Sequence, residues 1–247
     1  MYNDVMDLRE FYATPMGKMG RRLIRSRIRR LWSNLSGMTV LGLGYSTPYL
    51  QPFQNEANVV LAIMPSTQGV LHWPEREPGR VALSDDRELP FSDRSIDRLL
   101  IVHGLECSEN LRIMLREVWR VLADGGRIIA VVPNRRGLWS RFEQRSPFGH
   151  GHPYSTSQLR KLLRDCFFTP TAIERALYAP PIRSRLLMRS APAVEKVGSR
   201  WAQAVSGVLI VEASKQIYAG TAVPVQRSVR KRPLVALTGG ARHRKAG

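Results

Sequence analysis

The sequence has few cysteines, and it lacks a long apolar run. Its only cysteines among 247 residues are Cys107 and Cys166, and neither has a second cysteine nearby. This excludes a disulfide framework and a cysteine-based zinc site, and it is typical of a reduced cytoplasmic protein. No stretch approaches the roughly 20 apolar residues of a membrane-spanning helix, and acids at positions 4, 7 and 10 interrupt the region where a secretory signal would be apolar. We therefore expect a cytoplasmic protein without a membrane span.

Acidic residues are missing from two segments near the chain ends. Residues 18–30 read KMGRRLIRSRIRR, and residues 221–247 also contain no Asp or Glu. Over the whole chain, 38 Lys and Arg stand against 20 Asp and Glu, a net charge of +18. Such an excess attracts anionic partners, so we expect that nucleic acid could bind through the basic termini. The alternative is that these charges form a solvated helix face and a basic tail without a ligand.

Composition divides the chain into three parts. We expect a basic helical extension over residues 1–35, an α/β domain over 36–220 and a basic, disordered tail over 221–247. Within the extension, apolar residues recur three and four positions apart between arginines, which is the pattern of a helix with one buried face. We expect this helix to break near Pro15.

Within the middle part, apolar strand-like runs alternate with helical segments. The expected strands lie at residues 39–43, 59–63, 80–83, 96–102, 127–132, 171–176 and 207–213. Helices are expected at 109–126 and 156–166. This alternation is typical of a parallel sheet with helices on both faces, and the last two strands are expected to form an antiparallel edge.

The carboxyl ends of these strands carry the candidate binding residues, because ligands of open α/β sheets bind there. The first loop offers glycines that permit a close backbone approach, and a later loop offers carboxylates that accept hydrogen bonds from amino or hydroxyl groups. The expected ligand-binding residues are Gly42, Leu43, Gly44, Tyr45, Ser46, Ile63, Met64, Asp85, Asp86 and His103.

Two motifs in the middle of the chain carry a resemblance to a known family. The segments ALSDDRELPFSDRSIDRLLIVHGLE and LREVWRVLADGGRIIAVVPN resemble class I S-adenosylmethionine-dependent methyltransferases, the type 11 group in particular. The resemblance covers about residues 36–175. It implies a Rossmann-like, seven-stranded, mostly parallel sheet with its last strand antiparallel, helices on both faces, and S-adenosylmethionine as the cofactor. It also implies that the acids before Leu89 lie near the adenine.

The first loop departs from the family pattern, Asp/Glu-x-Gly-x-Gly. Gly42 stands in place of the acid and Ser46 in place of the second glycine, and the acid that holds the ribose falls on Ala62 or Ile63. Loss of a hydrogen bond to a charged group costs about 1.5–3 kcal/mol, which is roughly 10- to 150-fold in affinity. Three interpretations stay open: S-adenosylmethionine bound through backbone contacts and the later carboxylates, a different ligand, or a fold without catalytic activity.

Residues after the fourth and fifth strands supply the candidate catalytic and substrate residues. Methyl transfer from a sulfonium depends mainly on alignment, so a general base is needed only where the acceptor must lose a proton. The candidate bases are His103, His152 and Tyr154. The expected substrate residues are Trp139, Arg141, His150 and Arg183, whose arginines favour an anionic acceptor. For each histidine the alternative is a structural role, and for the aromatics it is packing of the loop. No metal site is expected, because no Cys or acid stands at ligand spacing near the histidines of that loop.

Together these observations predict an S-adenosylmethionine-dependent methyltransferase with an unidentified acceptor. The alternative is a catalytically silent protein of the same fold that acts through a partner or RNA. A dehydrogenase is the third hypothesis, but the sequence lacks both the third glycine of Gly-x-Gly-x-x-Gly and the downstream acid. The oligomeric state does not follow from the sequence.

Overall fold

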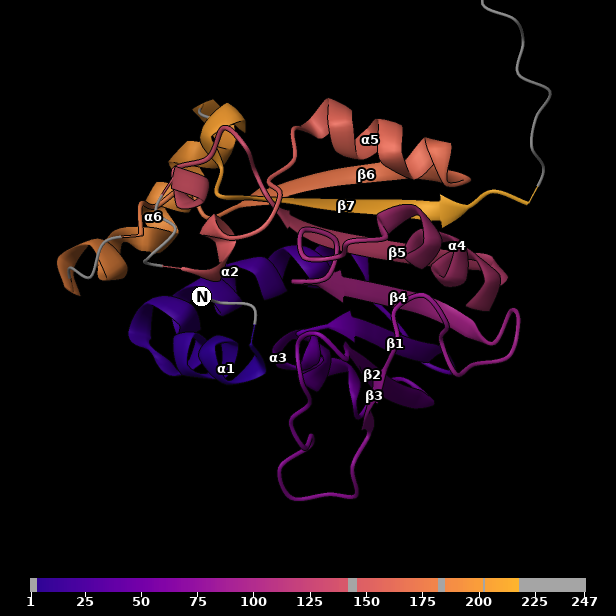
Figure 1. The fold of residues 1–247 in the computed structure, drawn as a ribbon. Coiled ribbons are helices and arrows are strands. Elements are labelled where there is room, and N and C mark those ends of the chain that lie inside the picture. The colour runs from indigo at the N-terminus through magenta and orange to yellow at the C-terminus, as the bar shows by residue number, and fades with distance from the viewer. Residues whose placement is uncertain (1–3, 142–145, 182–184, 202, 218–247) are drawn as a thin grey trace, which may run out of the picture. The chain divides into compact units, whose positions relative to one another are not determined.

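The computed structural model describes residues 4–141, 146–181, 185–201 and 203–217, which form one seven-stranded sheet with helices on both faces (Figure 1). The strands are β1 (Thr39–Gly44), β2 (Val59–Pro65), β3 (Val81–Ser84), β4 (Ile96–Val102), β5 (Leu122–Pro133), β6 (Phe168–Ala176) and β7 (Val208–Lys215). Their order is β3-β2-β1-β4-β5-β7-β6. β7 pairs antiparallel with both of its neighbours, β5 and β6, and the other pairings in the sheet are parallel. The predicted fold class is thereby confirmed.

The helices cover the two faces in two groups (Figure 1). One face carries α1 (Val5–Ala13), α2 (Pro15–Leu31) and α3 (Thr47–Leu50), and the other carries α4 (Leu111–Val121) and α5 (Thr156–Asp165). The remaining helix, α6 (Arg185–Trp201), lies beside α2 and precedes β7. Short 3-10 turns occur at Gln51–Phe53, Trp139–Arg141, Pro147–Gly149 and Gln203–Val205. Each face of the sheet therefore has its own apolar core.

The two N-terminal helices pack against the sheet, as their apolar stripe predicts. Leu8 and Ile24 are fully buried in the core on that face. The helices separate at Thr14, whose hydroxyl accepts a 3.0 Å hydrogen bond from the Gly17 amide and so caps α2. Proline then begins α2, where its missing amide hydrogen costs nothing. At the far end of α2, Trp32 donates a 3.2 Å hydrogen bond to Glu212 of β7.

Several element boundaries differ from those expected. β2 extends two residues further, to Pro65, and β5 begins five residues earlier, at Leu122. The helix α6 lies in a segment for which no element was expected. In the described part of the chain, no helix has both the length and the apolar character needed to cross a membrane. The predicted tail, 221–247, lies outside the described residues.

The parallel strands bring their carboxyl ends to one edge of the sheet. In the strand register Gly44 pairs with Val102 and Pro65 pairs with Ser84. The loops that follow β1, β2, β3 and β4 are therefore neighbours at this edge, which is where a ligand of an open α/β sheet is expected.

Candidate cofactor site

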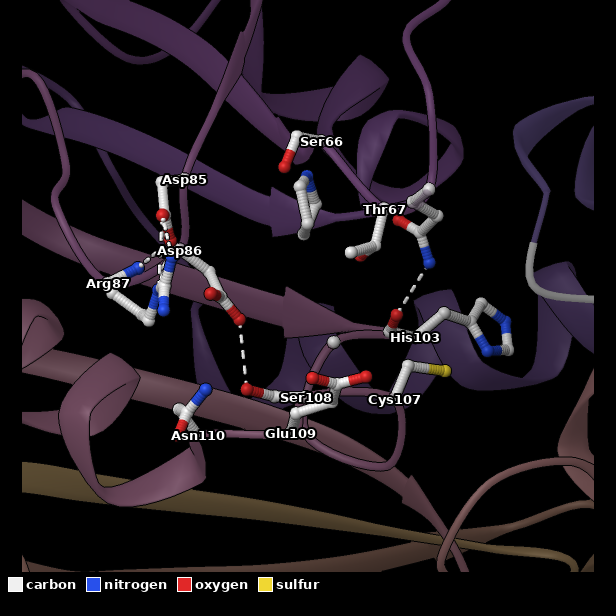
Figure 2. Close-up of a pocket in the computed structure, with 13 residues that line it drawn as sticks. Ser66, Thr67, Asp85, Asp86, Arg87, His103, Cys107, Ser108, Glu109 and Asn110 are labelled. Carbon is white, nitrogen blue, oxygen red and sulfur yellow. Dashed lines mark hydrogen bonds and ion pairs between the residues drawn. The ribbon is translucent and has the colours of Figure 1, made fainter.

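A cavity of about 240 Å³ lies at the carboxyl ends of β2, β3 and β4 (Figure 2). Its walls come from residues 65–68 after β2, 85–87 after β3, and 103, 104 and 107–110 after β4. Most of these side chains are polar, including the hydroxyls of Ser66, Thr67 and Ser108. The cavity is therefore suited to a ligand with several hydrogen-bonding groups.

The two neighbouring acids in this wall have different surroundings. Asp85 accepts hydrogen bonds from three groups of Arg87: the side-chain Nη2 (2.6 Å), the side-chain Nε (2.9 Å) and the backbone amide (2.9 Å). These bonds lower the pKa of Asp85 to about 2. Asp86 is half-buried, and this burial raises its pKa. Its Oδ2 accepts a 2.9 Å hydrogen bond from Ser108 (Figure 2). Because a carboxylate has about four acceptor positions, Asp86 retains capacity for a ligand.

The glycines of the β1 loop are required by packing within the chain. Gly44 has a φ of +76°, and a Cβ there would collide with the Val102 carbonyl oxygen. A Cβ on Gly42 would collide with the Ser46 hydroxyl and lie 2.6 Å from Leu50 Cδ1. Ser46 is fully buried and fills the space that Gly42 leaves. The predicted residues from Gly42 to Ser46 are not among those that line the cavity.

A buried aromatic cluster occupies the edge beside this loop. Its centre is Tyr12 of α1, whose hydroxyl lies 2.8 Å from the Tyr49 hydroxyl and 2.8 Å from His103 Nε2. The Tyr12 ring stacks on Tyr45 at a centroid distance of 5.6 Å. Burial raises the pKa of Tyr12 well above its usual value and that of Tyr45 to about 12, so both stay neutral phenols at physiological pH.

His103 belongs to this cluster more than to the cavity. Its Nδ1 lies 3.2 Å from Glu106 Oε1, and the Phe148 ring packs on it at 4.9 Å. Its backbone carbonyl, on the cavity side, accepts a 2.8 Å hydrogen bond from Gln68. Figure 2 shows the ring turned away from Asp86 and Ser108. A base at this position reaches a ligand only if the cluster opens.

The other candidate bases lie in the loop after β5. His152 is exposed, and its backbone amide donates a 3.0 Å hydrogen bond to the Glu106 carbonyl. The Tyr154 hydroxyl donates to the Leu105 carbonyl at 3.3 Å, and burial raises its pKa to about 12. Tyr154 is therefore a hydrogen-bond donor at neutral pH. Both residues lie near the segment that follows β4 but do not line the cavity.

The predicted substrate residues that the structure describes differ in their surroundings. Trp139 is fully buried, and its indole donates a 2.7 Å hydrogen bond to the Ala179 carbonyl. Arg141 is exposed, and the half-buried His150 lies beside the Ser146 carbonyl at 3.4 Å. Arg183 lies outside the described residues. Of this group, Trp139 packs the loop onto the domain, and the role of the others stays a prediction.

The end of β2 lies further along the chain than the sequence interpretation placed it. The family acid was placed at Ala62 or Ile63, but the strand continues to Pro65. Ala62, Ile63 and Met64 are all buried, so a carboxylate at position 62 would enter the core and would not meet a ribose. Residues 66 and 67 reach the cavity instead.

Sequence reasoning missed part of the cavity wall. The missed residues are Pro65, Ser66, Thr67, Gln68, Arg87, Gly104, Cys107, Ser108, Glu109 and Asn110. The polar run after the apolar segment VVLAIMP could have shown where β2 ends. Burial raises the pKa of Cys107 to about 12, so it stays a thiol at neutral pH. Within the described residues, no three His, Cys, Asp or Glu side chains cluster as metal ligands would.

Comparison with known proteins identifies a family and relatives. Residues 40–130 match the model of the family described as the methyltransferase domain. A demethylmenaquinone methyltransferase of Corynebacterium efficiens is 28% identical over 128 residues, which cover 52% of this chain and 56% of that protein. The chain thus matches about half the length of this curated relative.

Solved structures extend the similarity to most of the chain. One is an S-adenosylmethionine-dependent methyltransferase of Thermotoga maritima, described as a possible histamine N-methyltransferase. It is 15% identical to this chain with a TM-score of 0.58, and the match covers 86% of this chain and 95% of that one. A candidate methyltransferase of Haloferax volcanii, in complex with the Trm112 activator, is 17% identical at a TM-score of 0.61, covering 87% and 99%. The [4+2]-cyclase SpnF is 19% identical at 0.54, covering 80% and 82%. At these identities the likeness shows the fold alone.

Proposed function

Because the chain belongs to the class I S-adenosylmethionine-dependent methyltransferases of the type 11 group, we propose that it transfers a methyl group from S-adenosylmethionine to an acceptor. The observation that carries the proposal is the polar cavity at the strand ends, with the half-buried Asp86 in its wall. The family match favours this activity over the catalytically silent alternative.

The residues present fit one end of this cofactor and not the other. The cavity offers a carboxylate at Asp86 for the adenine amino group, and hydroxyls at Ser66 and Thr67 for the ribose. Its volume of about 240 Å³ is below the roughly 300–1,000 Å³ of typical ligand pockets. The edge beside the β1 loop is filled by the Tyr12 cluster. The lining of this cavity therefore supports a place for the adenosine part, and the cavity itself is too small to hold the amino-acid part as well.

The reaction places modest demands on the protein. When bound, S-adenosylmethionine supplies a methyl group on a sulfonium, which is already a good leaving group. The chain's contribution is to bind, to orient and to exclude water. An acceptor that must lose a proton would use His152, since Tyr154 stays protonated at neutral pH and can only donate a hydrogen bond. Arg141 is the described arginine proposed for an anionic acceptor.

Location and macromolecular partners stay predictions. A cytoplasmic location agrees with two cysteines that are both free. Nucleic acid could contact the exposed arginines of α2, among them Arg22, while the basic tail lies outside the described residues. The Haloferax volcanii structure is a complex with a methyltransferase activator, and pull-down from the source of this chain would test whether it has a comparable partner.

Ligand titration tests the proposed function. We expect S-adenosylmethionine and S-adenosylhomocysteine to release or absorb heat on binding, and to stabilise the fold by about 2.7 kcal/mol at 100 times the dissociation constant. Asp86→Asn should weaken binding roughly 10-fold or more, because it removes a charged acceptor. The matched control is Asp85→Asn, since Arg87 already occupies that carboxylate. No heat and no thermal shift at millimolar ligand would contradict the proposal.

A further inference from the structure

Tyr12 stands between two hollows of the molecule. One is the cavity beside Asp86, which His103 helps to line. The other is an open cleft of about 850 Å³, lined by Tyr12 itself, by Tyr45 and the start of α3, by residues 71–77, and by basic residues of α1 and α2. The 2.8 Å contact between the Tyr12 hydroxyl and His103 Nε2 joins the wall of one hollow to the wall of the other. The two spaces are therefore neighbours with Tyr12 as part of the partition.

The larger cleft is suited to a carboxylate. Arg9, Lys18 and Arg21 line it, and none of them forms an ion pair with another described residue. The acids of the cleft are Glu75 and Glu77, of which Glu77 pairs with Arg80 at 3.1 Å. Burial raises the pKa of Tyr45, while the charges of Arg9 and Arg21 act on it in the opposite direction. Both guanidinium groups are thus within electrostatic reach of the Tyr45 hydroxyl.

Two buried acceptors beside His103 lack hydrogen-bond donors. Among the described residues, Oε2 of Glu106 and Oε1 of Gln68 have no hydrogen-bond partner although they are buried, and the two residues bind His103 through their other polar atoms. Buried polar atoms are rarely left unpaired, so each one calls for an explanation. An ammonium group placed between the cavity and the cleft would supply the missing donors.

We propose that Tyr12 is a gate within the cofactor site, an inference that rests on the proposed function. Displacement of Tyr12 joins the two hollows into one cleft. The adenosine part of the ligand lies at Asp86, its ammonium group lies near Glu106 and Gln68, and its carboxylate lies at Arg9 and Arg21. Tyr49 and His103, which Tyr12 releases, then turn their polar atoms to the ligand. The joined cleft would then hold the whole cofactor, whereas the small cavity alone would not.

The local structure allows such a displacement. The helix that carries Tyr12 has only nine residues, and it ends at Thr14, whose extended backbone (φ −67°, ψ 157°) separates it from α2. Pro15 fixes the start of the next helix. A tilt of the short helix α1 about Thr14 would move Tyr12 together with the buried Val5, Leu8 and Phe11, and would leave α2 packed on the sheet.

Calorimetry with two probes and matched variants tests the gate. Adenosine needs only the open cavity, so its affinity should be the same in wild type, Tyr12→Phe and Tyr12→Ala. S-adenosylhomocysteine needs the joined cleft, so its affinity should rise about 10-fold in Tyr12→Ala, because the binding-competent fraction increases. Tyr12→Phe keeps the ring and loses the hydrogen bonds, and should show a smaller gain. Arg21→Gln should weaken S-adenosylhomocysteine about 10-fold and leave adenosine unchanged, whereas Arg22→Gln, outside the cleft, should change neither.

Hydrogen exchange on the unmodified chain keeps the test independent of how well the variants fold. S-adenosylhomocysteine should speed amide exchange over residues 5–13 and slow it over 65–68, whereas adenosine should produce only the second effect. If S-adenosylhomocysteine binds wild type while Tyr12→Ala brings no gain and residues 5–13 are unaffected, the gate is wrong and the proposed function stands. If neither probe binds any variant, both are wrong.

Discussion

Beside the loops that follow β2 and β3 and the segment 107–110 that follows β4, the sheet edge presents polar side chains to an open cavity. Beside the β1 loop, in contrast, aromatic side chains fill the edge. Ser66, Asp86 and Ser108 line the first region and keep hydrogen-bonding capacity for a ligand. In the second region, the Tyr12 hydroxyl is hydrogen-bonded to His103 Nε2, and the Tyr12 ring stacks on Tyr45. These side chains therefore contact each other where a ligand would otherwise contact them. The two regions belong to one edge and one strand register, so their difference comes from what covers them.

This contrast explains why the β1 loop retains glycines although its pattern departs from that of the family. In the second region the glycines serve the packing of the chain on itself, with Ser46 filling the space beside Gly42. A glycine-rich loop is therefore not by itself evidence for a bound ligand. The polar wall after β2 and β3 carries more of the functional argument.

The largest expected effect comes from the packed region. Gly44→Ala combines a left-handed backbone, which costs about 1–2 kcal/mol for an alanine, with a collision against the Val102 carbonyl, for which overpacking costs about 1–3 kcal/mol. We expect the free energy of unfolding to fall by about 3–4 kcal/mol in urea denaturation.

Gly37→Ala is the matched control for this change. Gly37 has a similar φ of +75°, but a Cβ there would meet no atom within 4 Å. We expect a loss of only about 1–2 kcal/mol, from the backbone alone. If the free energy of unfolding falls equally in Gly44→Ala and Gly37→Ala, contact with the Val102 carbonyl is not what requires a glycine at position 44. The glycines of the β1 loop would then not be explained by packing within the chain.

Tyr12→Phe is expected to have an intermediate effect. It leaves the Tyr49 hydroxyl and His103 Nε2 buried without this partner, which should lower the free energy of unfolding by about 1–3 kcal/mol. Tyr45→Phe keeps the same stacked pair, and the Tyr45 hydroxyl has no hydrogen bond to a described residue. The control should stay within about 0.5 kcal/mol of wild type. A similar loss in both variants would mean that the hydroxyl of Tyr12 does not hold the cluster together.

Much of the fold followed from the sequence, because it depends on local patterns. The alternation of apolar runs of four to seven residues with helical segments such as α4 predicted the parallel sheet. The motif around DDRELPF indicated the family. The antiparallel position of β7 also agreed with that resemblance. The boundary of β2 was missed, although Pro65 and the polar run STQG after it mark the end of the apolar segment.

The contents of the site were much harder to predict. Tyr12 and His103 are 91 positions apart in the chain, and nothing in the local sequence of either shows that they meet. Likewise, Asp85 and Asp86 are adjacent and identical in type, yet Arg87 occupies one and Ser108 contacts the other. Such differences depend on tertiary contacts, which a single sequence does not reveal.

The smallest expected effect tests the polar region through those two acids. The pKa of Asp85 is lowered from 3.8 to about 2, so its ionised form stabilises the fold above pH 4, and this stability is lost as the pH falls towards 2. The pKa of Asp86 is raised, so its contribution is present below its unfolded pKa and is lost as the pH rises through its folded pKa. Asp85→Asn should therefore be more destabilising at pH 6 than at pH 3. Asp86→Asn should be less destabilising at pH 6 than at pH 3. Urea denaturation at both pH values measures how the destabilisation by each variant changes with pH. If it changes in the same direction for both variants, the two acids do not differ as their contacts with Arg87 and Ser108 indicate.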